Sequence, residues 1–130
     1  MINSLVQIAL VVKDYDEAIE FYVNKLNFSL VEDTVLSATK RWVVITPKGT
    51  NSCKILLAKA TNQQQELSIG NQTGGRVFLF LHTIDIENDF VFLKNNNVKI
   101  VRPISDEPYG KVFVFEDLYG NLWDVIEPKK

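Results

Sequence analysis

The stretch Gln7–Tyr22, QIALVVKDYDEAIEFY, decides how this chain begins to fold. Residues 5–12 are apolar except for Gln7, and a short run rich in Val and Ile is typical of a strand buried on both faces. Asp14 then supplies an N-cap carboxylate, and Glu17 stands three residues later, where a capping box closes. The apolar positions that follow have helical spacing: Ala18, Ile19, Phe21, Tyr22 and Leu26. The sequence therefore predicts a strand followed by a helix.

Three more strands are predicted in the first half of the chain. They are Ser29–Leu36, Arg41–Thr46 and Cys53–Lys59, and the turn-forming residues Pro47–Asn51 join the last two. Together with the first strand and helix they predict a βαβββ module over residues 1–60. A polar segment, residues 61–75, contains three consecutive glutamines and ends in two glycines, which is typical of a linker between modules.

The same order of elements returns after this linker. The predicted elements are a strand Arg76–Leu81, a helix from about Thr83, a strand Val98–Pro103, and a hairpin of Lys111–Glu116 and Leu122–Glu127 around Asp117–Asn121. The second module, residues 76–130, is therefore a shorter copy of the first. Two copies favour two halves related by a pseudo-twofold within one structural domain, because a solenoid needs three or more shorter repeats.

The composition excludes several classes of protein. A chain that is 46% hydrophobic and 23% charged matches an ordinary globular protein. The net charge of -2, without a cluster of Lys and Arg, argues against a nucleic-acid partner. The apolar run Ile8–Val12 is far shorter than the ~20 residues of a membrane span, so no membrane partner is expected. The start lacks the basic region of a secretory signal, and the single cysteine excludes an internal disulfide, so we expect a cytoplasmic protein.

The opening Gln7–Tyr22 and the ending Phe115–Glu127, FEDLYGNLWDVIE, resemble the two signatures of the glyoxalase/bleomycin-resistance/dioxygenase (vicinal oxygen chelate) superfamily. The resemblance covers essentially the whole chain, since the βαβββ duplication is also that family's architecture. It implies an α+β fold of two tandem βαβββ modules forming half-open curved sheets. The superfamily includes glyoxalase-type lyases and isomerases, extradiol dioxygenases, thiol transferases that inactivate fosfomycin, and metal-free proteins that sequester bleomycin-like drugs.

Enzymes of this superfamily commonly hold a divalent metal through four side chains. The resemblance places these positions at Gln7 and Leu56 in the first module and at Arg76 and Asp124 in the second. Gln7 and Asp124 can donate oxygen ligands, whereas Leu56 has no donor and the guanidinium of Arg76 repels a cation. We therefore expect no metal cofactor. The alternative is a divalent metal whose coordination is completed by water, substrate or displaced residues.

Three of these residues are candidates for binding a ligand directly. Asp124 shares an apolar row with its strand neighbours, and because an unpaired buried carboxylate is costly we expect it to face a cavity. Arg76 is expected to pair with Asp124 across that cavity or to bind an anionic ligand bidentately, with a surface position as the alternative. Gln7 is either hydrogen-bonded within the core or faces a cavity.

Aromatic residues complete the candidate set. Trp42, Tyr109 and Trp123 are predicted to line a ligand cavity, and packing in the core is the alternative for each of them. His82 is expected to be a capping or surface residue rather than a metal ligand. Cys53 is expected to be a buried structural cysteine rather than a nucleophile.

These residues favour a protein that binds a small, partly aromatic or anionic molecule without a metal, in a β-lined cavity. A homodimer is expected, because each half-open sheet needs a partner and relatives pair two chains. The first alternative is a divalent-metal-dependent lyase, isomerase or dioxygenase. The second is a non-catalytic interaction protein that reuses the fold.

Overall fold

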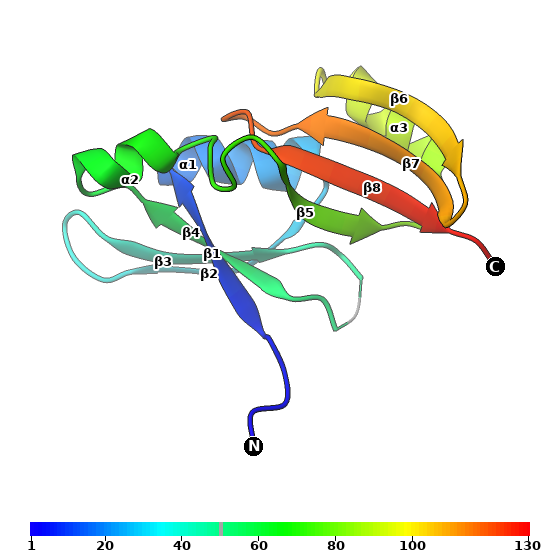
Figure 1. The fold of residues 1–130 in the computed structure, drawn as a ribbon. Coiled ribbons are helices and arrows are strands. Elements are labelled where there is room, and N and C mark those ends of the chain that lie inside the picture. Colours follow the sequence, from blue (N-terminus) through cyan, green and yellow to red (C-terminus); the bar gives the residue numbers. More distant parts are fainter. Residues whose placement is uncertain (50) are drawn as a thin grey trace. The chain divides into compact units, whose positions relative to one another are not determined.

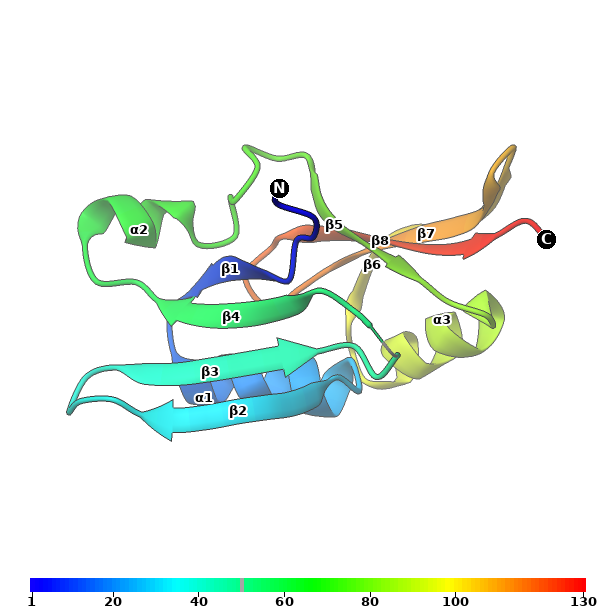
Figure 2. The same cartoon turned by 90° about the horizontal axis from the view of Figure 1, so that it is seen from below.

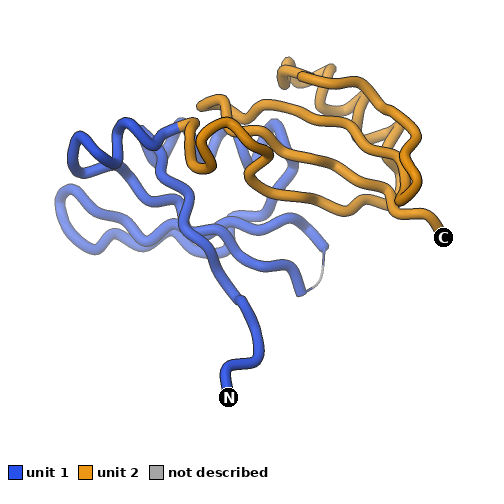
Figure 3. The backbone as a smooth tube through the Cα atoms, in the orientation of Figure 1, with its two compact units in different colours: residues 1–69 blue, residues 70–130 orange. Residues whose placement is uncertain are grey.

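The computed structural model describes residues 1–49 and 51–130 and divides into unit 1, residues 1–69, and unit 2, residues 70–130 (Figure 3). Thr50, in the predicted turn Pro47–Asn51, lies outside the described residues. Each unit contains one four-stranded sheet with a helix between its first and second strands (Figure 1). The two tandem βαβββ modules predicted from the sequence are therefore confirmed. Nowhere in the described ranges does a helix have the length and apolar character that crossing a membrane requires.

Unit 1 has its strands in the order β1-β4-β3-β2, with β1 parallel to β4 and the other neighbours antiparallel. Its elements are β1 (Gln7–Val12), α1 (Tyr15–Ile19), the π-helix η1 (Glu20–Lys25), β2 (Ser29–Val35), β3 (Arg41–Thr46), β4 (Lys54–Lys59) and α2 (Gln63–Ser68). In α1 the Asp14 carboxylate accepts a hydrogen bond from the Glu17 N–H at 2.8 Å, as the sequence predicted.

Unit 2 repeats this topology with the strand order β5-β8-β7-β6, in which β5 runs parallel to β8. Its elements are β5 (Val77–His82), α3 (Ile86–Asn95), β6 (Lys99–Glu107), β7 (Gly110–Glu116) and β8 (Leu122–Pro128). The N-cap of α3 is Asp85, two residues after the predicted start at Thr83. β6 continues past Pro103, which an edge strand tolerates because one side of its backbone needs no partner.

The helix that follows the first strand of each unit, η1 in unit 1 and α3 in unit 2, ends in the same way. Asn27 follows η1 and Asn97 follows α3, and both have a positive φ of 62°. Asparagine adopts this left-handed conformation more readily than most residues, so it can close a helix where glycine is more common. The next residues, Phe28 and Val98, are buried, which turns the chain back toward its sheet in both units.

One face of each sheet packs against its helix. In unit 1, α1 lies against one face of the sheet (Figure 2). This face carries fully buried Leu10, Val43 and Leu57, and α1 supplies the buried Ala18. In unit 2 the corresponding face carries these buried rings: Phe113, Phe115 and Trp123. Phe113 meets Phe90 of α3 edge-on at 5.2 Å between ring centroids. Because side chains alternate along a strand, the residues between these core positions point to the opposite, helix-free face.

Three sequence predictions need correction. The first strand starts at Gln7 rather than at Leu5, and it is not buried on both faces, since Ala9 is exposed while Leu10 and Val12 are fully buried. β1 is an edge strand with a helix on one side only, which explains the alternation. Cys53 is exposed rather than buried, because it lies just before β4 starts. The predicted linker 61–75 contains α2, which belongs to unit 1.

Candidate functional site

A hollow lined by described residues lies in unit 1, at the end of the sheet where β3 begins and β4 ends. It has a volume of about 650 Å³. We call it the Trp42 hollow, and the residues that matter here are Tyr15, Lys40, Trp42, Leu56, Lys59 and Gln65. Trp42 is half-buried on the helix-free face, since its neighbour Val43 points into the core. A volume of this size falls in the range of small-molecule sites, about 300–1,000 Å³.

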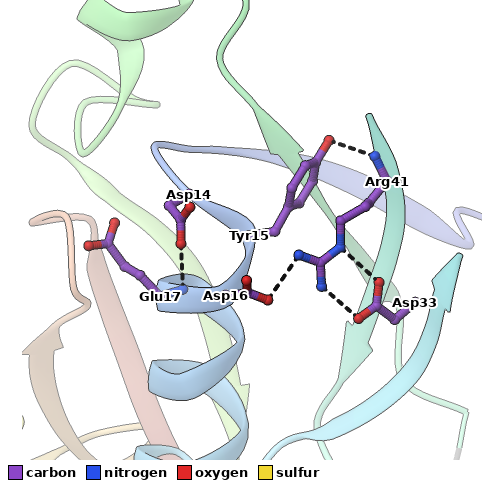
Figure 4. A network of polar contacts seen from close by, with 6 residues as sticks. All are labelled: Asp14, Tyr15, Asp16, Glu17, Asp33 and Arg41. Atoms are coloured by element: carbon purple, nitrogen blue, oxygen red, sulfur yellow. Dashed lines mark hydrogen bonds and ion pairs between the residues drawn. The ribbon is translucent and has the colours of Figure 1, made fainter. Parts of the chain in front are cut away.

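Arg41 fixes one wall of the Trp42 hollow through a network of polar contacts (Figure 4). Its Nε and one Nη donate to the two carboxylate oxygens of Asp33 at 3.0 and 2.7 Å, and its other Nη donates to Asp16 at 2.9 Å. The guanidinium also lies 5.2 Å from the ring centroid of Tyr15, whose hydroxyl accepts a hydrogen bond from the Arg41 N–H. This network ties the β2–β3 hairpin to the start of α1.

The charges in this network shift the pKa values of its members. Hydrogen bonds from Arg41 hold the pKa of Asp33 below its ordinary value, and the same contacts raise the pKa of Arg41. Asp33 is therefore ionised throughout the physiological pH range. The positive charge of Arg41 is largely balanced by Asp33 and Asp16 and is not offered to a ligand.

A smaller hollow lies on the helix-free face of unit 2 and has a volume of about 80 Å³. We call it the Asp124 hollow, and its polar lining is Arg102, Ser105, Glu107, Tyr109 and Asp124. The strand register explains how it forms, because Asp124 pairs with Val114 and Val114 pairs with Arg102 across the sheet. Asp124 and Arg102 therefore share one row and one face.

Asp124 carries an unusual carboxyl group. Its Oδ1 is buried and has no hydrogen-bond partner among the described residues. Burial raises the pKa of Asp124, and the positive charge of Arg102 opposes part of that shift. The group is consequently easier to protonate than an ordinary aspartate, and when protonated it can donate a hydrogen bond.

The predicted pair of Arg76 with Asp124 is wrong. Arg76 is exposed, lies before β5 begins, and forms no ion pair within the described ranges. The cation whose charge acts on Asp124 is Arg102, which sequence separation alone did not suggest. The register of β6 on β7 would have identified Arg102 as the neighbour of Asp124. Two irregularities in that pairing shift the register, so it cannot be obtained by counting residues along the sequence.

The positions expected to hold a metal can be compared unit by unit. Ala9 lies five residues before the N-cap of α1 and pairs with Leu56 on the neighbouring strand. Phe80 lies five residues before the N-cap of α3 and pairs with Asp124. Leu56 and Asp124 therefore occupy equivalent positions in the two units. Counting back in the same way, the position in unit 2 that is equivalent to Gln7 is Phe78 rather than Arg76.

The donors at these positions do not fit a divalent ion. Unit 1 offers the amide of Gln7 beside apolar Leu56, and unit 2 offers a phenyl ring at Phe78 and the carboxyl of Asp124, whose pKa is raised by burial. Elsewhere in the described part of the chain, no group of three or more His, Cys, Asp or Glu side chains is arranged to hold a metal.

The two remaining aromatic candidates of unit 2, Tyr109 and Trp123, lie in different environments. Tyr109 lies in the turn between β6 and β7, is 55% exposed, and lines the Asp124 hollow. Trp123 is fully buried, stacks on Phe115 at 5.9 Å, and donates from its indole N–H to Asp117 at 3.0 Å. It is a core residue on the helix-facing side, so the prediction that Trp123 lines a ligand cavity is corrected.

Gln7 lies in a third hollow, of about 470 Å³, which is also lined by exposed Cys53 and by Lys54. His82 is exposed at the end of β5, so the expected surface position is confirmed, while Asp85 provides the cap. Of the six predicted ligand residues, Tyr109 and Asp124 line one hollow together, whereas Gln7 and Trp42 line two other hollows among the described residues. Sequence reasoning missed Lys40, Lys59 and Arg102.

Comparison with known proteins agrees with this architecture. The family model of the Glyoxalase/Bleomycin resistance protein/Dioxygenase superfamily matches residues 4–125. A relative from Shewanella frigidimarina, described as an uncharacterized protein, is 56% identical over 128 residues, which are 98% of this chain and 95% of the relative.

Two solved structures show the same fold over the whole chain. The crystal structure of UcmS2 has a TM-score of 0.85 at 24% identity and covers 98% of this chain and 99% of that one. The structure of TnmS3, described as an antibiotic binding protein from Streptomyces sp. CB03234, has a TM-score of 0.78 at 24% identity and covers 98% of both chains.

Proposed function

Because this chain belongs to the glyoxalase/bleomycin resistance protein/dioxygenase superfamily, we propose that it binds a small molecule without a metal ion, in the Trp42 hollow of unit 1. The observation that carries this proposal is the contrast between two sets of residues. The positions at which metal-dependent relatives hold their ion supply a poor donor set, whereas the Trp42 hollow combines ligand-sized volume with an accessible indole.

The chemistry of the Trp42 hollow supports recognition of a ring. Trp42 is half-buried, so one part of the indole packs on the sheet while another part stays available for stacking. Leu56 and Ala58 extend the apolar surface from β4, and Gln65 of α2 adds one amide at the edge. Stacking on an aromatic side chain contributes about 0.5–1.5 kcal/mol beyond buried area. The solved structure described as an antibiotic binding protein makes a small molecule a reasonable ligand class.

Binding is tested with N-phenylnaphthylamine, a neutral aromatic probe, by fluorescence titration. We expect saturable binding, and we expect Trp42→Ala to weaken it by about threefold to tenfold, since the stacking surface is removed. Tyr109→Ala is the matched control, because it removes an exposed aromatic ring from unit 2. No saturable binding, or binding that depends on Tyr109 rather than Trp42, contradicts the proposal.

Metal independence is tested by elemental analysis of the purified protein. We expect less than one divalent ion per chain, and no glyoxalase or ring-cleaving activity after addition of Ni²⁺, Zn²⁺, Mn²⁺ or Fe²⁺. Stoichiometric metal that is lost in Asp124→Ala would favour the metalloenzyme. A protein that binds neither metal nor aromatic probe would favour the non-catalytic interaction protein.

We further propose that the protein forms a homodimer. Each sheet ends in two edge strands, and exposed apolar side chains such as Val35 on β2 and Phe80 on β5 lie on them. Covering such edges is a common reason for chains to associate. Sedimentation at micromolar concentration is expected to show twice the chain mass, and a single species of 14.8 kDa would contradict the dimer.

A further inference from the structure

The charged residues around the Trp42 hollow are all basic. Lys40, Arg41 and Lys59 line it, and no acidic residue does so among the described residues. The chain as a whole has a net charge of -2, so this local excess of positive charge is opposite to the average of the protein. A cavity lined by charges of one sign attracts ligands of the opposite sign.

The three cations are not equivalent. Arg41 is held by Asp33 and Asp16, as described above, so its charge is already balanced. Lys40 and Lys59 are exposed, and neither forms an ion pair within the ranges that the structure describes. These two ammonium groups are therefore the ones available to an incoming anion.

Lys40 and Lys59 come from different elements and line the Trp42 hollow where the sheet ends. Lys40 directly precedes β3, two residues before Trp42. Lys59 ends β4 two residues after Leu57, so it starts from the helix-facing side of the strand, and its flexible side chain lines the hollow at the end of the sheet. A ligand that stacks on Trp42 therefore has flexible cations within reach of its edge.

The Asp124 hollow of unit 2 has the opposite character. Two carboxyl groups, Glu107 and Asp124, line it with a single cation, Arg102. Its volume of about 80 Å³ is also too small for an aromatic molecule of ordinary size. An aromatic anion is thus matched by the Trp42 hollow and not by the Asp124 hollow.

We propose that the ligand of the Trp42 hollow is an aromatic anion, a planar ring system bearing a carboxylate, sulfonate or phenolate, whose ring stacks on Trp42 and whose charge is met by Lys40 and Lys59. This assignment rests on the proposed binding function and names its ligand class. It excludes cationic aromatic molecules as preferred ligands, since they would meet two uncompensated ammonium groups.

The test compares two probes that share one skeleton. Anilinonaphthalene sulfonate carries a sulfonate that N-phenylnaphthylamine lacks. We expect Lys40→Gln combined with Lys59→Gln to weaken binding of the sulfonate probe by about fivefold, as two partly exposed ion pairs allow, and to change binding of the neutral probe by less than about twofold. Raising the salt concentration should weaken the sulfonate probe selectively in the unmodified protein and not in the double variant.

The control variant combines Lys129→Gln with Lys130→Gln. It changes the net charge equally but lies at the C-terminus in unit 2, so it should leave both probes unaffected. Equal loss of the sulfonate probe in both double variants would overturn the assignment, because the effect would then follow net charge. Binding of the sulfonate probe that is unchanged in Lys40→Gln/Lys59→Gln would also overturn it. Either result leaves the proposed function intact, since that function depends on Trp42 and the neutral probe.

Discussion

Unit 1 and unit 2 share a backbone plan but differ on their helix-free faces. Both have an aspartate N-cap, an asparagine after the helix, and a parallel pair between their first and last strands. On the helix-free face, Leu56 of unit 1 stands where unit 2 has Asp124. One face therefore carries the apolar core that both units share, while the side chains on the other face differ in polarity and charge.

The two tryptophans illustrate this division. Trp123 lies on the helix-facing side of β8 and is fully buried, whereas Trp42 lies on the helix-free side of β3 and is half-buried. A large aromatic residue in a strand thus has one of two roles, depending on the face to which it points. The comparison of units predicts the outcome of substitutions on each face.

The largest expected effect is that of Trp123→Ala. Removing a fully buried indole leaves a cavity beside Phe115, so the free energy of unfolding should fall by about 3–5 kcal/mol. Trp42→Ala, the matched change on the other face, should cost less, about 2 kcal/mol, because part of the indole remains in contact with solvent. Denaturant unfolding of both variants measures the difference. Equal losses would show that the helix-free face is also part of the core.

Asp117→Ala should have the next largest effect. The buried carboxylate of Asp117 accepts hydrogen bonds from the N–H groups of Tyr119 and Asn121, the side-chain amide of Asn121 and the indole of Trp123, each at 3.0 Å. Without it these donors lose their acceptor, and we expect a loss of about 3 kcal/mol in unfolding free energy. Asp106→Ala, at an exposed position in the same unit, should change stability by less than about 0.5 kcal/mol. Similar losses in both variants would contradict this role of the turn.

Arg41→Lys should have a smaller effect, which depends on pH. Lysine cannot reproduce the bidentate contact with Asp33, so the free energy of unfolding should fall by about 1 kcal/mol at neutral pH. The folded-state pKa of Asp33 lies below its ordinary value of 3.8, so this stabilisation is present above that value and is lost as the pH falls through the lowered pKa. Unfolding curves at neutral and strongly acidic pH should therefore converge. A constant difference at every pH would mean that the contact is not ionic.

Asp124→Asn should produce the smallest effect, with the opposite sign. Burial raises the folded-state pKa of Asp124 above its ordinary value of 3.8, so the stability of the protein falls as the pH rises through this interval. The amide carries no charge and removes that dependence, which makes the variant slightly more stable than the unmodified protein at neutral pH. Thermal unfolding across this pH range is the measurement. A less stable variant at neutral pH would show that the ionised carboxylate supports the fold.

The order of elements was predictable because it depends on local signals. Periodicity and caps near Asp14 predicted the first strand and helix, and the boundaries of β3 were predicted to the residue. The helix α2 was missed, since its polar sequence lacks an apolar face. The predicted start of β1 at Leu5 and the predicted end of β6 at Pro103 differ from the observed positions, Gln7 and Glu107. Pairing with neighbouring strands determines where a strand starts and ends.

The sequence by itself determined the duplicated βαβββ plan, because caps, turns and periodicity act over a few neighbouring residues. The superfamily followed from the resemblance of the opening Gln7–Tyr22 and the ending Phe115–Glu127 to the family signatures. Only the tertiary structure decided which side chains meet. Strand pairing placed Arg102, rather than Arg76, in the same cross-strand row as Asp124, and strand alternation buried Trp123 while leaving Trp42 accessible. The physical reason is that a shift of one residue in a strand moves a side chain to the other face of the sheet. The irregularities in β5 and β6 that set this register arise from contacts between distant segments of the chain.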